Sequence, residues 1–144
     1  MIPTVLDAYP TPPCARLLGL EILEADKEAG RVRIRFEGRP DFCNASGTLQ
    51  GGLLAAMLDD TIGPAVLIAT DAQRLPVTIS MNVTYLSPAR PGPIIGTATV
   101  GKLGSTIGYV EAVLEDRHGA EIARATASVR LVKMPPPEAA TPRS

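Results

Sequence analysis

Two carboxylates lie inside the longest apolar run of the chain and are its best candidates for chemistry. Between Leu53 and Ala69 only Asp59, Asp60 and Thr61 interrupt side chains that are apolar or small. A helix over this run would be apolar on nearly every face and therefore buried. A buried carboxylate is costly unless it is paired or kept neutral by a raised pKa, and such acids concentrate at functional sites. The run therefore predicts a candidate acid–base group.

A purely structural explanation of the same residues stays open. The Gly51-Gly52 pair before the helix is typical of a tight turn, and aspartate on a helix is usually solvated. Adjacent helical residues point about 100° apart. Asp59 and Asp60 cannot face the same way, so we expect at most one of them to be catalytic.

Composition excludes several classes of partner. The chain has 144 residues, which suits one domain, and a net charge of −1 without a basic run. Aromatic residues make up 3% and tryptophan is absent, which disfavours nucleic-acid binding by either electrostatics or stacking. No signal-peptide pattern is present, and residues 53–69 read as too short and too acidic for a membrane span. We expect a cytoplasmic protein that binds neither nucleic acid nor membrane.

The two cysteines suggest neither a disulfide framework nor zinc. Cys14 and Cys43 lie in no CxxC or Cys/His spacing, so reduced thiols and no metal site are expected. His118, the only histidine, lies in a turn. A Cys43–His118 nucleophile pair is therefore disfavoured.

Hydrophobic periodicity predicts the elements that must position these groups. Val32, Ile34 and Phe36 alternate with arginines, as in a half-buried strand. A helix from residue 51 or 52 to 69 follows, and Gly63-Pro64 is expected to kink or break it. The expected elements are a short helix at 13–18, strands at 20–25, 31–36, 77–86, 94–102, 107–116 and 120–132, and this central helix.

The order of elements predicts an α+β architecture in which one antiparallel sheet wraps around the long central helix. Residues 1–13 are expected to form an extended lead-in, 14–133 a single domain, and 134–144 a disordered tail. One sheet leaves one side of the helix open. We expect a second copy of the chain to close it.

The residues around the central helix carry a family pattern. Asn44, Gln50-Gly51-Gly52, Asp59 and the segment 80–90 resemble the hotdog-fold acyl-CoA thioesterases of the phenylacetate-pathway (PaaI-like) group, over about residues 14–133. That family's motif is an Asn, five residues, then His-Gly-Gly, with an acid nine positions after the His. Asp59, not Asp60, falls at the position of the acid. Gln50 replaces the commoner His and cannot act as a general acid.

The resemblance implies hydrolysis of an acyl-CoA to a carboxylic acid and free CoA, with no cofactor because CoA is part of the substrate. Asp59 would be the nucleophile or the general base, and the Gly51 N–H at the helix start would stabilise the oxyanion. Asn44 would orient the water or the carboxylate, Thr78 would help to position that water, and Gln50 would hydrogen-bond the thioester oxygen.

The resemblance also places two turns near the nucleotide and pantetheine of CoA. One spans 87–92, which by itself reads as a strand-ending turn, and the other spans 102–106. Arg90 and Lys102 could meet phosphates as charge-assisted partners. The residues expected to contact the substrate are Gly52, Arg90, Lys102, Gly104, Ser105 and Thr106.

Helix geometry predicts that the site is shared between chains. Asp59 lies eight residues after Gly51, which is roughly 12 Å along a helix, too far for both to engage one carbonyl easily. We therefore expect a homodimer, and the dimers of the family it resembles imply that Asp59 of one chain faces Asn44, Gln50 and Gly51 of the partner. The family suggests further pairing into a homotetramer.

Two alternative functions fit these residues less well. An acyl-CoA-binding hotdog domain without turnover would not need Asn44, Gly51 and Asp59 at catalytic spacing. A dehydratase or hydratase would need a histidine with its acid, and His118 is misplaced for that. The acyl group, aromatic or medium-chain aliphatic, stays open, as does the choice between direct attack by Asp59 and attack by water.

Overall fold

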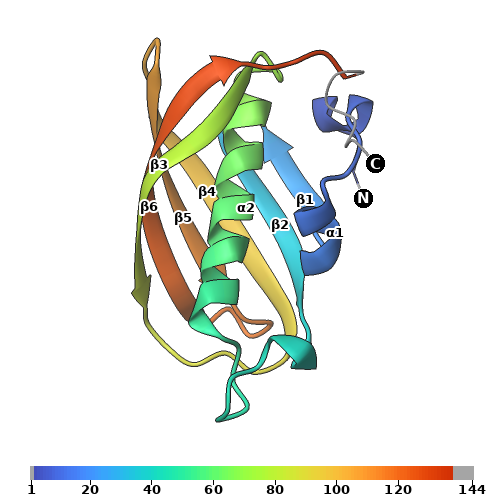
Figure 1. Ribbon diagram of the computed structural model, residues 1–144, viewed down its shortest axis with the longest axis vertical. Helices are drawn as coiled ribbons and strands as arrows, with labels where there is room; N and C mark the ends of the chain where they lie inside the picture. The colour runs from blue at the N-terminus through green and yellow to red at the C-terminus, as the bar shows by residue number, and fades with distance from the viewer. Residues whose placement is uncertain (1, 138–144) are drawn as a thin grey trace.

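The computed structural model describes residues 2–137, and in it one sheet wraps around one long helix (Figure 1). The sheet has six strands in the order β1-β2-β4-β5-β6-β3, and all neighbours are antiparallel. This confirms the expected α+β architecture. The elements are η1 (Val5–Ala8), α1 (Pro13–Leu18), β1 (Glu21–Asp26), β2 (Arg31–Gly38), η2 (Pro40–Phe42), α2 (Gly51–Ala69), β3 (Arg74–Tyr85), β4 (Gly92–Leu103), β5 (Ile107–Glu115) and β6 (Glu121–Lys133).

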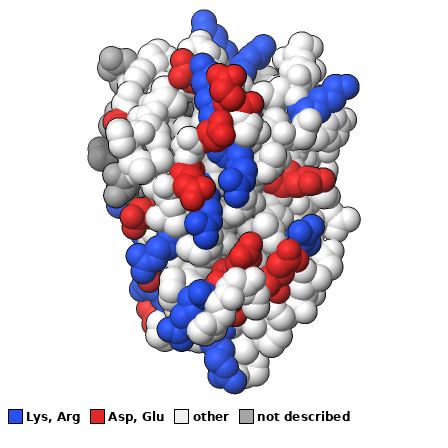
Figure 2. All heavy atoms as spheres, turned by 180° about the vertical axis from the view of Figure 1, so that it is seen from behind, with Lys and Arg blue, Asp and Glu red and all other residues white. Residues whose placement is uncertain are grey.

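The sheet presents an apolar face to α2 and a charged face to solvent. Val32, Ile34 and Phe36 of β2 are fully buried. The alternate arginines, 31, 33 and 35, point outward and pair with glutamates of β1 and β2. Figure 2 shows positive and negative side chains intermixed on the face behind that of Figure 1. The alternation thus fixes which side of each strand faces the helix.

Close contact between α2 and β4 depends on a glycine in the strand. A Cβ at Gly96 would collide with the Oγ1 atom of Thr61 and would crowd Phe36 and Leu114. Thr61 is completely buried, and its hydroxyl donates to the Met57 carbonyl at 2.7 Å. The polar group inside the helix–sheet contact is therefore satisfied.

The helix does not break at Gly63-Pro64, because α2 runs as one α-helix from Gly51 to Ala69 with Pro64 inside it. Proline removes only its own N–H from the helical ladder, and Pro64 is buried. Burial of Ala65, Val66 and Ile68 keeps the last turns of the helix in place.

The chain ends differ in part from expectation. Residues 5–8 are not extended, because a capping box between Thr4 and Asp7 stabilises η1, and Val5 and Leu6 pack against the core. The short helix α1 ends at Gly19, as expected, with φ 67°. Most of the tail expected to be disordered, residues 138–144, lies outside the described residues.

From the sequence, residues 53–69 are expected to be too short and too acidic for a membrane span. By length and composition, however, the whole of α2 could cross a membrane. Half of its apolar window is nevertheless buried inside the fold. A helix enclosed by its own sheet passes the same test, so its hydropathy reflects its place in the core.

Candidate active site

Asp59 lies on the open side of α2 and is held by the neighbouring edge strand. Among the positions of α2, only Gly52 and Asp59 are exposed, and they are seven residues apart, so they share one face. The Thr78 hydroxyl of β3 donates to Oδ1 of Asp59 at 2.7 Å. The structure therefore brings together the acid and the hydroxyl that the sequence selected.

Asp60 points elsewhere and is the more buried of the two acids. Its Oδ2 atom is buried and has no hydrogen-bond partner among residues 2–137. Burial, followed by the charge of Asp59, raises the pKa of Asp60 to about 6. Burial, followed by the charge of Asp60, also raises the pKa of Cys14 in α1. In the single chain the partly buried carboxylate of this helix is thus Asp60, whereas Asp59 is open to solvent.

Asn44 shapes the loop that leads into α2. Its Oδ1 accepts from the Ser46 N–H at 3.0 Å and from the Thr48 N–H at 3.2 Å. Its Nδ2 donates to the Thr48 hydroxyl at 3.0 Å. Within one chain the Asn44 side chain is thus engaged by its own loop, and no hydrogen bond joins it to Asp59 among residues 2–137.

The first N–H groups of α2 are left open. Gln50 is the N-cap residue, its exposed side chain makes no capping hydrogen bond, and its carbonyl accepts from Leu53 and Leu54. No hydrogen bond to the N–H of Gly51 or Gly52 occurs within the part of the chain that the structure describes. Two donors therefore point outward at the positive end of a 19-residue helix. Such an arrangement can stabilise a developing oxyanion.

Tyr85, which the sequence reasoning missed, lies against this helix start. Its hydroxyl donates to the Gly51 carbonyl at 2.7 Å. A Cβ at Gly51 would lie 3.2 Å from the Cζ atom of the Tyr85 ring. Tyr85 stands in the segment that resembles the family, but no spacing in the sequence indicates that this ring packs on the glycine.

The residues expected to bind CoA fall at opposite ends of α2. Arg90 lines a cleft of about 260 Å³ together with Arg117 and His118. The Leu49 N–H bonds the Ala89 carbonyl at 2.8 Å, so this cleft neighbours the start of α2. Backbone hydrogen bonds from residues 120 and 118 hold the pKa of Asp116 in this cleft below its usual value.

The second expected turn, residues 102–106, closes the β4–β5 hairpin at the other end of the molecule (Figure 1). There Arg74, at the start of β3, donates to the Ser105 carbonyl at 3.3 Å, and the Leu131 N–H donates to the Thr106 carbonyl at 2.7 Å. One chain therefore does not bring Lys102, Gly104, Ser105 and Thr106 together with Arg90.

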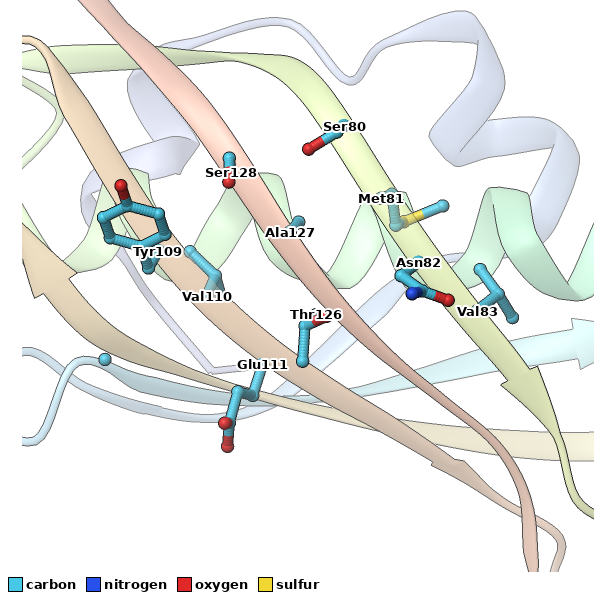
Figure 3. A pocket seen from close by; sticks show the side chains of 11 residues that line it. Ser80, Met81, Asn82, Val83, Tyr109, Val110, Glu111, Thr126, Ala127 and Ser128 are labelled. Carbon is cyan, nitrogen blue, oxygen red and sulfur yellow. The ribbon is translucent and has the colours of Figure 1, made fainter.

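A hollow of about 600 Å³ lies on strands β3, β4, β5 and β6 (Figure 3). Polar side chains such as Ser80, Asn82, Glu111 and Thr126 line it. None of the candidate catalytic residues is among its lining residues. Among residues 2–137 no three His, Cys, Asp or Glu side chains form a potential metal site, and both cysteines are free.

A family model described as Thioesterase superfamily matches residues 46–123, more than half of the chain. This chain belongs to the thioesterase superfamily. Acyl-coenzyme A thioesterase 13 of Homo sapiens is 35% identical over 103 residues, which cover 71% of this chain and 72% of that protein. Membership of this superfamily confirms the expected enzyme class, a thioester hydrolase.

Solved structures confirm the hotdog fold of this thioesterase and its likeness to the phenylacetate-pathway group. A phenylacetic acid degradation-related protein from Ralstonia eutropha JMP134 is 31% identical, with a TM-score of 0.82 over 88% of this chain and 95% of that chain. The E. coli PaaI protein from the phenylacetic acid degradation operon is 18% identical, with a TM-score of 0.78 over 85% and 86% of the two chains. Because the E. coli PaaI protein is only 18% identical, its likeness supports the fold alone.

Proposed function

We propose that this thioesterase hydrolyses an acyl-CoA, with an aryl, phenylacetyl or medium-chain acyl group, to the carboxylic acid and free CoA. The human relative named as an acyl-coenzyme A thioesterase supports the substrate class. The observation that carries the proposal is the carboxylate of Asp59, exposed on α2 and hydrogen-bonded by Thr78. An acid fixed in this way is ready for either of two routes.

In one route Asp59 is the general base. Thr78 engages Oδ1, so Oδ2 is left to take a proton from a water that attacks the thioester carbonyl. In the other route the carboxylate attacks directly, expels the CoA thiolate and forms a mixed anhydride, which water then hydrolyses. Both routes consume one water and release one acid and one CoA thiol, and neither requires a metal or an organic cofactor.

The start of α2 supplies the oxyanion donors. The Gly51 N–H, unpartnered within residues 2–137, would bond the carbonyl oxygen as charge develops on it, and the exposed Gln50 amide would add a further donor. Gln50 cannot deliver a proton. It does not need to, because a thiol, whose pKa is about 8.5 in cysteine, is acidic enough to leave as the thiolate.

The site would be completed by a second copy of the chain at the edge formed by β3. This strand has no neighbour on its outer side within the described chain, and Val77 and Ile79 on it are 49% and 58% exposed. A long edge strand with apolar side chains requires cover. A two-fold axis perpendicular to this edge strand would run the partner's α2 in the opposite direction. Asp59 of one chain would then face Asn44, Gln50 and Gly51 of the partner subunit.

The same two-fold relationship would bring together the residues expected to bind CoA, which lie at opposite ends of α2 within one chain. Because the partner is reversed, its β4–β5 hairpin would lie toward the end of the molecule that carries Arg90. Phosphates could then meet Arg90 and Arg117 from one chain and Lys102 from the other. Further pairing of dimers into a homotetramer stays a prediction.

Thiol release from a panel of acyl-CoAs tests the reaction. The panel contains phenylacetyl-, benzoyl-, short-chain and medium-chain acyl-CoA, and it is run with wild type, Asp59→Asn and Asp60→Asn. We expect Asp59→Asn to lower kcat by at least about a hundredfold, and Asp60→Asn, the adjacent acid on another face, to stay within a few-fold.

Two results would overturn the proposal. Full turnover by Asp59→Asn would remove Asp59 from the mechanism. Binding of acyl-CoA without turnover of any member of the panel would make the protein a binding domain.

A further inference from the structure

Two hydroxyl groups of β3 reach the two chemically important positions of α2. Thr78 donates to the Asp59 carboxylate and Tyr85 to the Gly51 carbonyl, each at 2.7 Å. The first bond holds a group that would react. The second holds the Gly51 carbonyl, which takes no part in hydrolysis. A catalytic effect of this hydrogen bond must therefore act through the rest of the same peptide group.

We propose that Tyr85 is a positioning residue: its hydroxyl fixes the first peptide of α2, so that the Gly52 N–H becomes a second oxyanion donor beside that of Gly51. This inference rests on the proposed thioester hydrolysis. The residue that touches the reacting oxygen is Gly52, and Tyr85 acts through it.

The geometry of the peptide bond connects the two groups. The Gly51 carbonyl and the Gly52 N–H are opposite ends of one planar unit, so a bond that holds the carbonyl also sets the direction of the N–H. In a helix the carbonyl points toward the C-terminus and the N–H toward the open N-terminal end. A donor on the carbonyl also polarises the N–H at the other end, and this strengthens it as a donor.

Tyr85 crowds Gly51 but leaves the space around Gly52 open. A Cβ at Gly51 would meet the Tyr85 ring at 3.2 to 3.4 Å, whereas one at Gly52 would meet nothing within 4 Å. Tyr85 thus closes the approach at Gly51 on its side and leaves Gly52 open. Gly52 is also the position of α2 that is exposed on the same face as Asp59. Because the Gly52 N–H points toward the open end of α2 and has no partner within residues 2–137, a carbonyl oxygen that approaches this end has access to it.

Tyr85→Phe tests the role, because it keeps the ring and removes only the hydroxyl. We expect kcat for acyl-CoA to fall about tenfold while KM changes less than about twofold, since the lost interaction matters only when charge develops on the oxygen. Tyr109→Phe is the matched control. Tyr85 is 51% exposed and Tyr109 52%, and no hydrogen bond of the Tyr109 hydroxyl occurs within residues 2–137. An unchanged kcat in Tyr85→Phe would overturn the inference.

Two further measurements separate positioning from general stabilisation. The Gly52 amide signal in a ¹H–¹⁵N spectrum should move in Tyr85→Phe, whereas that of Gly101, in β4, should not; an unmoved Gly52 signal would contradict the inference. Gly52→Pro removes the N–H within the first helical turn, where proline is tolerated, and Gly52→Ala keeps it.

We expect kcat of Gly52→Pro to lie at least about tenfold below that of Gly52→Ala. Equal values would exclude the Gly52 N–H as a donor. If wild type hydrolysed no acyl-CoA, the proposed function would fail, and the Gly52 signal would still decide whether Tyr85 fixes this peptide.

Discussion

The Thr78 hydroxyl and the Asp59 carboxylate join the edge of the sheet to the exposed face of the central helix, with Oγ1 and Oδ1 2.7 Å apart. The pairing of β3 with β6 shifts register between Thr78 and Ser80. Such an irregularity re-aims the side chains next to it. The direction of the Asp59 carboxylate therefore depends on the local shape of β3 as well as on the helix.

Replacing Thr78 by valine should lower kcat by about 10- to 100-fold and leave KM nearly unchanged. Valine keeps the shape but removes the hydroxyl, and a hydrogen bond to a charged group contributes about 1.5–3 kcal/mol. Thr78→Ser, which keeps the hydroxyl, should retain most of the activity. Thiol-release kinetics of the three proteins check this, and a valine variant with wild-type kcat would show that Asp59 needs no such support.

The cleft beside the helix start should bind the nucleotide end of the substrate. Arg90→Gln and Arg117→Gln should each raise KM for acyl-CoA several-fold at low salt, because each removes a charge that could meet a phosphate. The KM for the matching acyl-pantetheine, which lacks the nucleotide, should not change. Arg35→Gln, on the solvent face of β2, is the control. An equal rise for both substrates would mean that the cleft does not bind the nucleotide.

The ionisation of Asp60 should lower the free energy of unfolding as the pH rises. Its pKa in the folded chain is about 6, above the ordinary value of 3.8, so the folded state holds the proton more tightly than the unfolded state. The stabilisation is complete below about pH 4 and is lost as the pH rises through 6. Asp60→Asn stays neutral and should gain about 1–2 kcal/mol over wild type between pH 4 and pH 8.

Urea unfolding at the two pH values measures this difference. Asp41→Asn, which alters an exposed ion pair with Arg39, is the control. Its free energy of unfolding should differ little from that of wild type at either pH. A constant difference between Asp60→Asn and wild type across this range would show that Asp60 does not hold its proton more tightly in the folded chain.

The sequence was informative wherever a local pattern decides the structure. Alternation along residues 31–36 indicates which face of β2 is buried, and the apolar run indicates a core helix. Asp59 and Asp60 were identifiable as candidate acids because they interrupt the apolar run of one helix. The choice of Asp59 over Asp60, and the roles of Asn44 and Gln50, came from the family resemblance. Thr78 could be named only through the family resemblance.

The features that sequence could not supply depend on packing between distant segments. Tyr85 contacts Gly51 across 34 positions of the chain, and no periodicity reports such a contact. Which of Asp59 and Asp60 is buried depends on how α2 is rotated against the sheet and on where α1 lies. The helix continues through Pro64 because burial of the following turns outweighs the loss of one hydrogen bond.

A subunit-mixing experiment should reveal whether the site is shared. Asp59→Asn removes the acid, and Gly51→Ala disturbs the helix start, because its Cβ would press on Tyr85. If the acid and the donors come from different chains, a heterodimer of these two variants has one site with both defects and one intact site. Purified with two different tags, it should then regain about half of the wild-type kcat per dimer.

If each site lay within one chain, every site in this heterodimer would carry one defect, and its activity would not exceed that of the parent variants. That result would contradict the shared site. A differently tagged pair of Asp59→Asn chains serves as the control, since neither arrangement gives it an intact site. Because regained activity is the positive result, partial loss of stability in either variant cannot imitate it.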